Sequence, residues 1–330
     1  MKANPKVVLG MPAYNRSDTL ARSLESLLSQ TYTDFALVVV HDGPSTEVAA
    51  IVETYAREYP RIRYAENETR LGMVGNWRKV FERARELYPP AHYFAWVGDH
   101  DLWHPRWLHE LVSVLDKQPH VVVAYAENLL MMTDNAKITD RVFDTFGVTS
   151  RVKRLRLSAR YMLSGDMIYG LMRADALEAA GVFRHVVTPD RQVLLALSLF
   201  GQTRQVREVL WYREVLRVFD LKRQRSVFFP DGTPSYTYVS SHVQHCATLL
   251  WDFAVQGRGR PAFGRLAAVG YAAIQLWASF VRDLVALART VRMKSANYWF
   301  GRWLWSFLPS GADMRSARRH ASGHVDVPHA

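Results

Sequence analysis

The first two hundred residues alternate between short, continuous apolar runs and longer segments of helical period. Apolar runs at residues 6–11, 35–40, 93–97 and 121–126 predict buried strands, and residues 61–65 predict a further short strand. Apolar residues three or four apart predict helices at 17–30, 46–59, 76–87 and 106–115, with a polar loop at 67–75. Strands that are apolar throughout, separated by helices, indicate an α/β fold with a mostly parallel sheet and helices on both faces.

Polar residues follow three of these strands at the point where each one ends. The three groups are Pro12, Tyr14 and Asn15; His41, Asp42 and Gly43; and Gly98, Asp99 and Asp101. Right-handed crossovers bring the carboxyl ends of parallel strands to one rim, where open α/β sheets bind their ligands. We therefore expect ligand chemistry at this rim.

Asp99 and Asp101 flank His100 and precede a helical segment. Two carboxylates this close repel each other unless a cation or hydrogen-bond donors compensate them, and a divalent metal carrying a substrate phosphate is the usual compensation. The alternative is that one of the acids only caps the following helix. The sequence has no GxGxxG or GxxxxGK[ST] motif, which argues against a dinucleotide-binding Rossmann domain and a P-loop.

Five stretches, in order, resemble the inverting family-2 glycosyltransferases with a GT-A fold. They are residues 7–16 (opening strand and Pro-x-Tyr-Asn turn), 38–45 (Asp-Asp-Gly-Ser strand end), 67–76 (Asn…Gly…Asn segment), 97–105 (Asp-x-Asp strand) and 165–199 (acceptor side). The resemblance covers about residues 6–215. It implies a GT-A fold, a nucleotide-diphosphate sugar donor, a divalent metal (Mg or Mn) and inversion at the transferred sugar.

The resemblance also assigns roles to residues at the rim. It implies donor binding by Pro12, Tyr14, Asn15, Asp42, Asn76 and Asp99, and metal binding by Asp101 as direct ligand with Asp99 and His100. The chain departs from the family in two places. His41 replaces the first acid of Asp-Asp-Gly-Ser, so uracil is not assured as the base, and Gly98 and His100 stand where the family often has Asp.

Asp190, after Pro189 at the start of a predicted helix, is the candidate catalytic base. Inverting transfer needs one carboxylate to deprotonate the acceptor hydroxyl, and the resemblance places that acid here. The alternative is a first-turn acid favoured by the helix dipole. Residues 206–212 predict an edge strand. The basic run beyond it, including Arg223 and Arg225, is either a solvated loop or a lid that, with Arg191, grips a diphosphate.

Residues 239–309 have a helical pattern, and residues 266–281 contain no charge. Sixteen residues fall short of the ~20 needed to span a bilayer. An aromatic-rich, basic, amphipathic helix is typical of a membrane interface, and packing on the catalytic domain or across a dimer is the alternative. Residues 310–330 are polar and predict a disordered tail.

The charge of the chain is unevenly distributed. Its net charge is +11, but residues 1–150 carry 16 Lys and Arg against 19 Asp and Glu, and residues 151–330 carry 26 against 12. The basic half attracts nucleic acid, anionic lipid or a phosphorylated substrate. The single cysteine, Cys246, excludes an intramolecular disulfide framework and a Cys-rich zinc site, and no secretory signal is recognisable.

Together these features predict four regions: a catalytic GT-A domain (1–215), a basic lid or linker (216–238), a helical, membrane-associating region (239–309) and a tail. We expect a metal-assisted glycosyltransferase that acts on a cell-envelope or lipid-linked glycan, without nucleic acid as partner. It would lie in the cytoplasm on the inner face of the membrane, either as a monomer or as a homo-oligomer. The alternatives are a nucleotidyltransferase and a non-catalytic binder of nucleic acid or anionic membrane.

Overall fold

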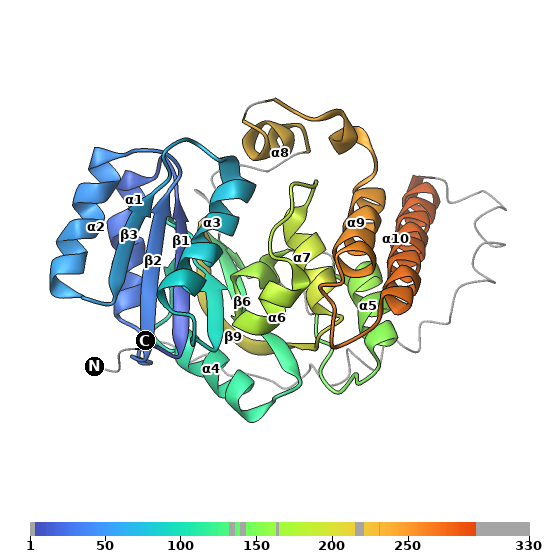
Figure 1. Ribbon diagram of the computed structural model, residues 1–330, viewed down its shortest axis with the longest axis horizontal. Helices are drawn as coiled ribbons and strands as arrows, with labels where there is room; N and C mark the ends of the chain where they lie inside the picture. Colours follow the sequence, from blue (N-terminus) through green and yellow to red (C-terminus); the bar gives the residue numbers. More distant parts are fainter. Residues whose placement is uncertain are drawn as a thin grey trace. The chain divides into compact units, whose positions relative to one another are not determined.

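The computed structural model describes residues 4–131, 136–138, 143–162, 165–214, 221–230 and 232–294. The chain divides into two compact units, Met1–Phe280 and Val281–Ala330. The first unit contains the sheet and the candidate site (Figure 1).

Within the described residues, nine strands form one sheet in the order β3-β2-β1-β4-β8-β6-β9-β5, with β7 paired to β6. The strands are β1 (Val7–Ala13), β2 (Phe35–His41), β3 (Ile62–Glu66), β4 (Tyr93–Trp96), β5 (Leu102–Trp103), β6 (Val121–Met131), β7 (Ala136–Ile138), β8 (Leu171–Arg173) and β9 (Gln202–Glu214). Strands β1 to β4 are mutually parallel, so their carboxyl ends share one rim. The predicted mostly parallel α/β sheet is confirmed.

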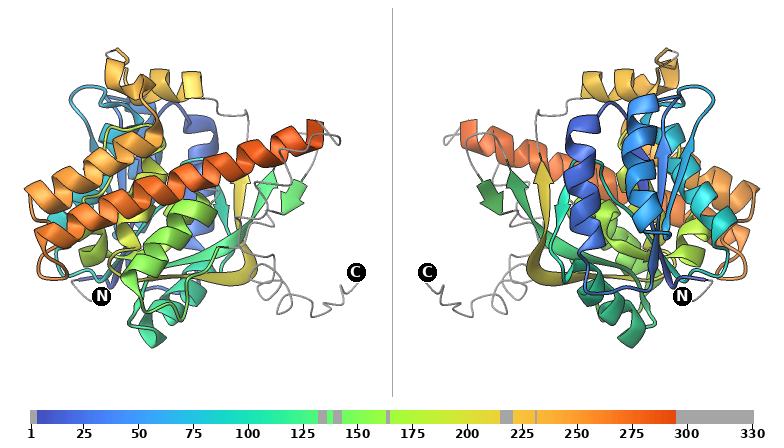
Figure 2. Two further views of the ribbon diagram at one scale, coloured as in Figure 1. Left: turned by 90° about the vertical axis from the view of Figure 1, so that its right-hand side faces the viewer. Right: turned by 90° about the vertical axis from the view of Figure 1, so that its left-hand side faces the viewer.

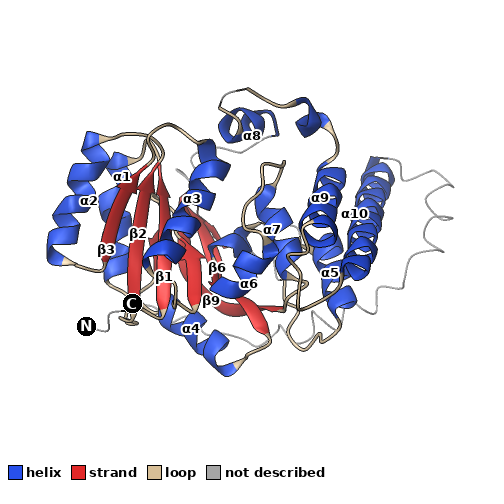
Figure 3. Cartoon of the chain, in the orientation of Figure 1, coloured by secondary structure: helices blue, strands red, loops and turns tan. Residues whose placement is uncertain are grey.

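The helices are α1 (Ser17–Leu28), α2 (Thr46–Glu58), α3 (Gly72–Leu87), α4 (Trp107–Lys117), α5 (Arg151–Tyr161), α6 (Ala174–Ala180), α7 (Pro189–Leu197), α8 (Leu221–Phe228), α9 (Ser241–Leu249) and α10 (Arg265–Lys294). Shorter helical turns are η1 (Asp166–Tyr169), η2 (Ser235–Tyr238) and the π-helical η3 (Leu250–Val255). Figure 3 shows helices against the sheet over its whole width.

Alternation along β1 separates two hydrophobic cores. Leu9 packs with Leu20 and Leu24 of α1, in a core shared with α2 and α4. Val8, which points to the other face, packs with Val80 of α3, in a core shared with α5, α6 and α7. The right-hand view of Figure 2 shows α1 and α2 side by side on one face. Helices therefore cover both faces, as the apolar strands require.

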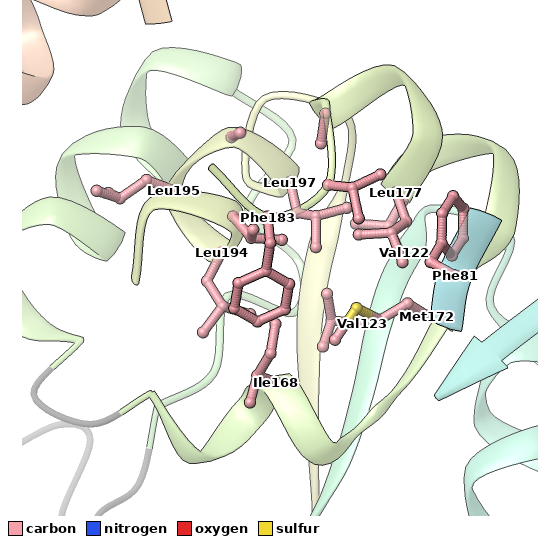
Figure 4. Close-up of a cluster of buried hydrophobic side chains, with 14 of the residues drawn as sticks. Phe81, Val122, Val123, Ile168, Met172, Leu177, Phe183, Leu194, Leu195 and Leu197 are labelled. Carbon is pink, nitrogen blue, oxygen red and sulfur yellow. The ribbon is translucent and has the colours of Figure 1, made fainter. Parts of the chain in front are cut away.

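The second core anchors α7, the helix that begins beside the candidate base. Leu194 of α7 is buried near Phe183, which follows α6, and Ile168 of η1, and Leu195 belongs to the same buried cluster (Figure 4). Burial of each such side chain stabilises the fold by about 1.5–3 kcal/mol. The start of α7 is therefore firmly fixed relative to the sheet.

Two elements differ from the sequence-based expectation. Helix α3 begins at Gly72 and not at residue 76. Gly72 adopts φ +74°, a conformation that glycine allows, and the chain then enters the helix early enough to bury Val74. Strand β9 was predicted as an edge strand, but it lies between β6 and β5. Its outer partner β5 has only two residues, too few for a sequence pattern to predict.

The compact units also differ from the expected boundaries at residues 215 and 238. Phe228 and Phe229 of the expected lid, and Leu249 and Phe253 of the expected helical region, share the core of α6 and α7. The structure therefore groups them with the catalytic sheet, and the division falls at Phe280. The expected tail, 310–330, lies outside the described residues.

Candidate active site

The ends of β1, β2 and β4 open onto a cavity of about 630 Å³. Tyr14, Asp42, Asn76, Asp99 and His100 line it from the strand side, and Asp190 lines it from the start of α7. Pro12 also contributes. The structure thus brings together seven of the residues singled out in the sequence, from segments up to 178 positions apart.

Asp99 is held by its neighbours on both carboxylate oxygens. Its Oδ2 accepts a hydrogen bond from the backbone amide of Tyr14 at 3.1 Å, and its Oδ1 lies 2.7 Å from Nδ1 of His100. The turn is further fixed because Thr19 Oγ1 donates to the Asp99 carbonyl at 3.0 Å. The ends of β1 and β4 are thereby joined at the cavity wall.

Asp101, expected as the direct metal ligand, is not among the residues that line the cavity. Its side chain is 1% exposed, its Oδ2 accepts from Trp211 Nε1 at 3.0 Å, and its Oδ1 accepts from the Glu214 amide at 3.0 Å. Burial raises the pKa of this carboxyl, although His100 and the hydrogen bonds oppose the rise. In this geometry Asp101 ties β9 to the strand-end turn.

His100 lies between the two acids, with Nε2 3.8 Å from Asp101 Oδ1. Burial by itself would lower the pKa of this imidazole, but the hydrogen bond to Asp99 and the charges of Asp101 and Asp99 outweigh it, so the pKa is raised. His100 lines the cavity next to Asp99.

Asp42 is the centre of a buried polar network that forms part of the cavity wall. Its Oδ1 accepts from the Leu71 amide at 2.7 Å and from Asn67 Nδ2 at 3.2 Å. Asn67 also donates to Asn76 Oδ1 at 3.0 Å, and Asn76 donates to the Val40 carbonyl at 3.1 Å. This network links the end of β2 to the start of α3, so the Asn…Gly…Asn segment acts as one unit.

Asn15 does not line the cavity. It adopts φ +51°, a left-handed conformation that Asn tolerates better than most residues. Its effect is therefore on the path of the chain between Tyr14 and Arg16, both of which do line the cavity.

The Asp190 side chain lines the cavity and lies directly against Gly165, where a residue with a side chain would overlap it. A Cβ atom on Gly165 would lie 1.5 Å from Asp190 Oδ2, so only glycine leaves room for the carboxylate. Burial raises the pKa of Asp190, the charge of Asp166 adds to the rise, and the backbone amide and charge of Arg191 oppose it. The side chain of Arg191 does not line the cavity, contrary to expectation.

Arg213 is a cavity residue that the sequence-based site did not include. Its Nη1 donates to Asp166 Oδ1 at 2.7 Å, and its guanidinium lies 5.8 Å from the centre of the Trp211 ring. Burial would lower the pKa of Arg213, but nearby Tyr169 and the acids Asp166, Asp101 and Asp190 raise it. Its membership of a basic run was visible in the sequence, but its acidic neighbours come from distant segments.

Two further arginines, Arg16 and Arg70, line the cavity on the strand side. Arg70 lies over the Tyr14 ring at 4.5 Å from its centre. The expected lid contributes mainly Val227 and Phe228 of α8, which are apolar. Arg225 instead donates to the Thr237 carbonyl at 3.1 Å, and the side chain of Arg223 lies outside the described residues.

Within the cavity, the side formed by Asp99 and His100 is the place where a divalent metal would fit. Among the described residues, no three His, Cys, Asp or Glu side chains are grouped closely enough to hold a metal by themselves. Asp99 and His100 line the cavity, and each oxygen of Asp99 has a second lone pair beyond its hydrogen bond. Magnesium commonly binds through one or two carboxylates plus substrate phosphate and water, which Asp99 allows.

The parallel strands covered by helices, with a cavity at their carboxyl ends, define an α/β fold of the GT-A class. The crystal structure of S. aureus TarS 1–349 in complex with UDP-GlcNAc is similar in fold, with a TM-score of 0.55 and 16% identity over 84% of this chain and 73% of that chain.

The family description "Glycosyl transferase family 2" matches residues 9–174, half of the chain. The chain belongs to this family. It is 32% identical over 149 residues to EpsE of Bacillus subtilis (strain 168), which its name describes as a glycosyltransferase, covering 45% of this chain and 48% of that protein. It is 41% identical over 83 residues to MT1568 of Mycobacterium tuberculosis (strain CDC 1551 / Oshkosh), covering 25% of each. The chain therefore matches half or less of the length of these two relatives.

Proposed function

We propose that the chain is an inverting glycosyltransferase that uses a nucleotide-diphosphate sugar, with Asp190 as the base. The observation that carries this proposal is the position of Asp190 in the same cavity as Asp99 and Asp42, with its pKa raised by burial. A carboxylate with increased proton affinity, facing a site for a phosphorylated ligand, suits general-base catalysis.

Transfer in this cavity needs a single displacement. The acceptor hydroxyl attacks the anomeric carbon from the side opposite the diphosphate, Asp190 takes the hydroxyl proton, and the C–O bond to the diphosphate breaks with its electron pair. One displacement inverts the configuration of the anomeric carbon. Because Gly165 has no side chain, the Asp190 carboxylate can occupy this position, which the step requires.

The donor would lie along the strand ends. The Asp42 network and Tyr14 supply polar groups and a ring for the nucleoside, and Arg16 and Arg70 supply positive charge beside them. Asp99 and His100 would hold the divalent metal, which when bound neutralises charge on the leaving diphosphate. Arg213 supplies a further cation on the Asp190 side.

For the acceptor we propose a cell-envelope or lipid-linked glycan. The support lies at the α8 side of the cavity, where Val227 and Phe228 place apolar side chains within the same cavity as Arg213. Such a combination suits an acceptor that carries both an apolar part and a sugar or phosphate.

Thermal unfolding with a panel of nucleotides tests the proposed donor. UDP or GDP with Mn²⁺ at about 100 times the dissociation constant should stabilise the protein by ~2.7 kcal/mol, while an oligonucleotide without metal should not. Absence of a shift with every nucleotide diphosphate, together with stabilisation by the oligonucleotide, would favour the non-catalytic binder. NMR of the first sugar released from an α-linked donor should show the β anomer, and the α anomer would contradict inversion.

A further inference from the structure

Helix α10 buries two polar residues among alanines on its inward side and exposes large apolar residues on its outward side. On the inward side, Gln275 and Ser279 are 0% and 1% exposed, and Gln275 Nε2 donates to Ser279 Oγ at 3.2 Å. On the outward side, Leu266 is 91% exposed, Trp277 67% and Phe280 51%. A surface helix of a globular protein normally has the opposite arrangement, so the outward face suits contact with an apolar phase.

The outward residues form one continuous stripe, which we call the α10 stripe. It consists of Leu266, Val269, Ala273, Trp277 and Phe280, all exposed and spaced three or four residues apart. At about 100° per residue, they lie within a sector of roughly 80°. No charged residue interrupts the sequence between Arg265 and Arg282.

The inward side attaches the helix to the catalytic core. Ala268, Ala272 and Ala278 belong to the same buried cluster as Phe253 and Phe263. By length and composition the stretch Arg265–Ala288 could cross a membrane, and 22% of its most apolar 18-residue window is buried. Crossing would detach the alanines from this core and expose the polar groups of Gln275 and Ser279 to hydrocarbon, which is unfavourable. A helix lying along a membrane surface keeps both contacts.

The charges around the stripe favour an anionic surface over a second copy of the chain. Residues 258–280 carry three arginines and no acid. Two such helices repel each other, whereas anionic lipid headgroups attract them. Figures 1 and 2 show α9 beside α10, and Trp251 and Val255, just after α9, are also exposed. Tryptophan is enriched where proteins meet the membrane–water interface.

We propose that the α10 stripe binds the surface of a lipid bilayer that contains anionic headgroups. The apolar side chains would enter the boundary between headgroups and acyl chains, and the exposed Arg265 at the start of the stripe would lie among the phosphates. This binding uses no residue of the cavity, so it stands or falls separately from the proposed transfer reaction.

Co-sedimentation with vesicles tests this surface. The full chain should bind vesicles of phosphatidylcholine with one quarter phosphatidylglycerol and bind pure phosphatidylcholine much more weakly. The double substitution Trp277→Gln with Phe280→Gln should reduce binding at least about tenfold, because two partly exposed aromatic side chains no longer enter the bilayer. Tyr161→Gln, at an exposed aromatic residue of α5, is the matched control and should bind as the original protein does. Undiminished binding by the double variant, or equal binding to both vesicles, would overturn the proposal.

Two measurements keep the test decisive if the double variant folds poorly. Trp277→Phe should bind normally but lose part of the fluorescence quenching caused by brominated phosphatidylglycerol, and unchanged quenching would place Trp277 outside the bilayer. Light scattering without lipid should show the same monomeric mass for the original protein and the double variant. A dimer that the double substitution converts to monomer would show that a second copy covers the stripe instead.

Discussion

The substitution Gly165→Ala should reduce turnover at least about 100-fold without removing donor binding. A Cβ atom at this position lies 1.5 Å from Oδ2 and 2.5 Å from Cγ of Asp190. Since non-bonded atoms normally approach to about 3.5 Å, the carboxylate has to move by roughly 2 Å. A misplacement of ~1 Å at a reacting group is enough to lose about 100-fold in rate.

The side chain of Asp190, and not its helix, is expected to move. Buried leucines, including Leu194 and Leu195, fix α7 in the core, as Figure 4 shows. The remaining crowding should lower the free energy of unfolding by about 1–3 kcal/mol, as overpacking does elsewhere. Such a loss is compatible with a folded protein, so rate and stability can be separated.

The assay measures hydrolysis of the nucleotide sugar that stabilises the protein, since water replaces the acceptor and needs the same base. Calorimetry gives the donor dissociation constant, and urea unfolding gives the stability. Gly264→Ala is the control, because its Cβ would meet no atom within 4 Å. Turnover of Gly165→Ala within threefold of the original enzyme would refute the assignment of Asp190 as a tightly positioned base.

Three further predictions concern charged groups of the cavity. Because burial raises the pKa of Asp190 and a base acts only when deprotonated, turnover should fall as pH decreases, with a midpoint above the ~3.9 of an ordinary aspartate; a flat profile down to about pH 4 would contradict this. Arg213→Met removes a cation near Asp190 and should move that midpoint to higher pH, and an unmoved midpoint would exclude electrostatic contact between the two. Asp101→Asn should lower the free energy of unfolding by about 2 kcal/mol, measured in urea, whereas Asp99→Asn should raise the metal concentration for half-maximal turnover at least about tenfold; the reverse pattern would make Asp101 the ligand.

The position of the strand rim could be predicted because it depends on neighbouring residues in the sequence: an apolar strand followed at once by polar residues. Strands β1, β2 and β4 are continuous apolar runs that are followed by polar groups, and parallel pairing then places Tyr14, Asp42 and Asp99 at one rim. The Asn…Gly…Asn segment was also recognisable in the sequence. Because it contains Gly72 and Gly75, however, the first turn of α3 was predicted to be part of a loop. The local sequence thus predicted the rim that lines the cavity more accurately than it predicted the first residue of α3.

The direction of each acidic side chain was not predictable. Asp99 and Asp101 are two positions apart in the sequence, and the difference between them arises from Trp211 and the Glu214 amide, more than 100 residues away. The roles of Gly165 and Arg213 also depend on partners in other segments, Asp190 and Asp166. Such long-range contacts leave no pattern in the local sequence.

The central claim is that Asp190 removes a proton from the acceptor while the rest of the cavity binds the donor. The most direct measurement compares turnover and donor affinity of Asp190→Asn with those of Asp175→Asn on the same donor. Both aspartates are the second residue of a helix, so Asp175 controls for the helix dipole and lies outside the cavity. We predict that Asp190→Asn loses at least about 10²-fold in turnover with donor affinity unchanged, and that Asp175→Asn changes neither. Turnover of Asp190→Asn close to that of the original enzyme would contradict the claim.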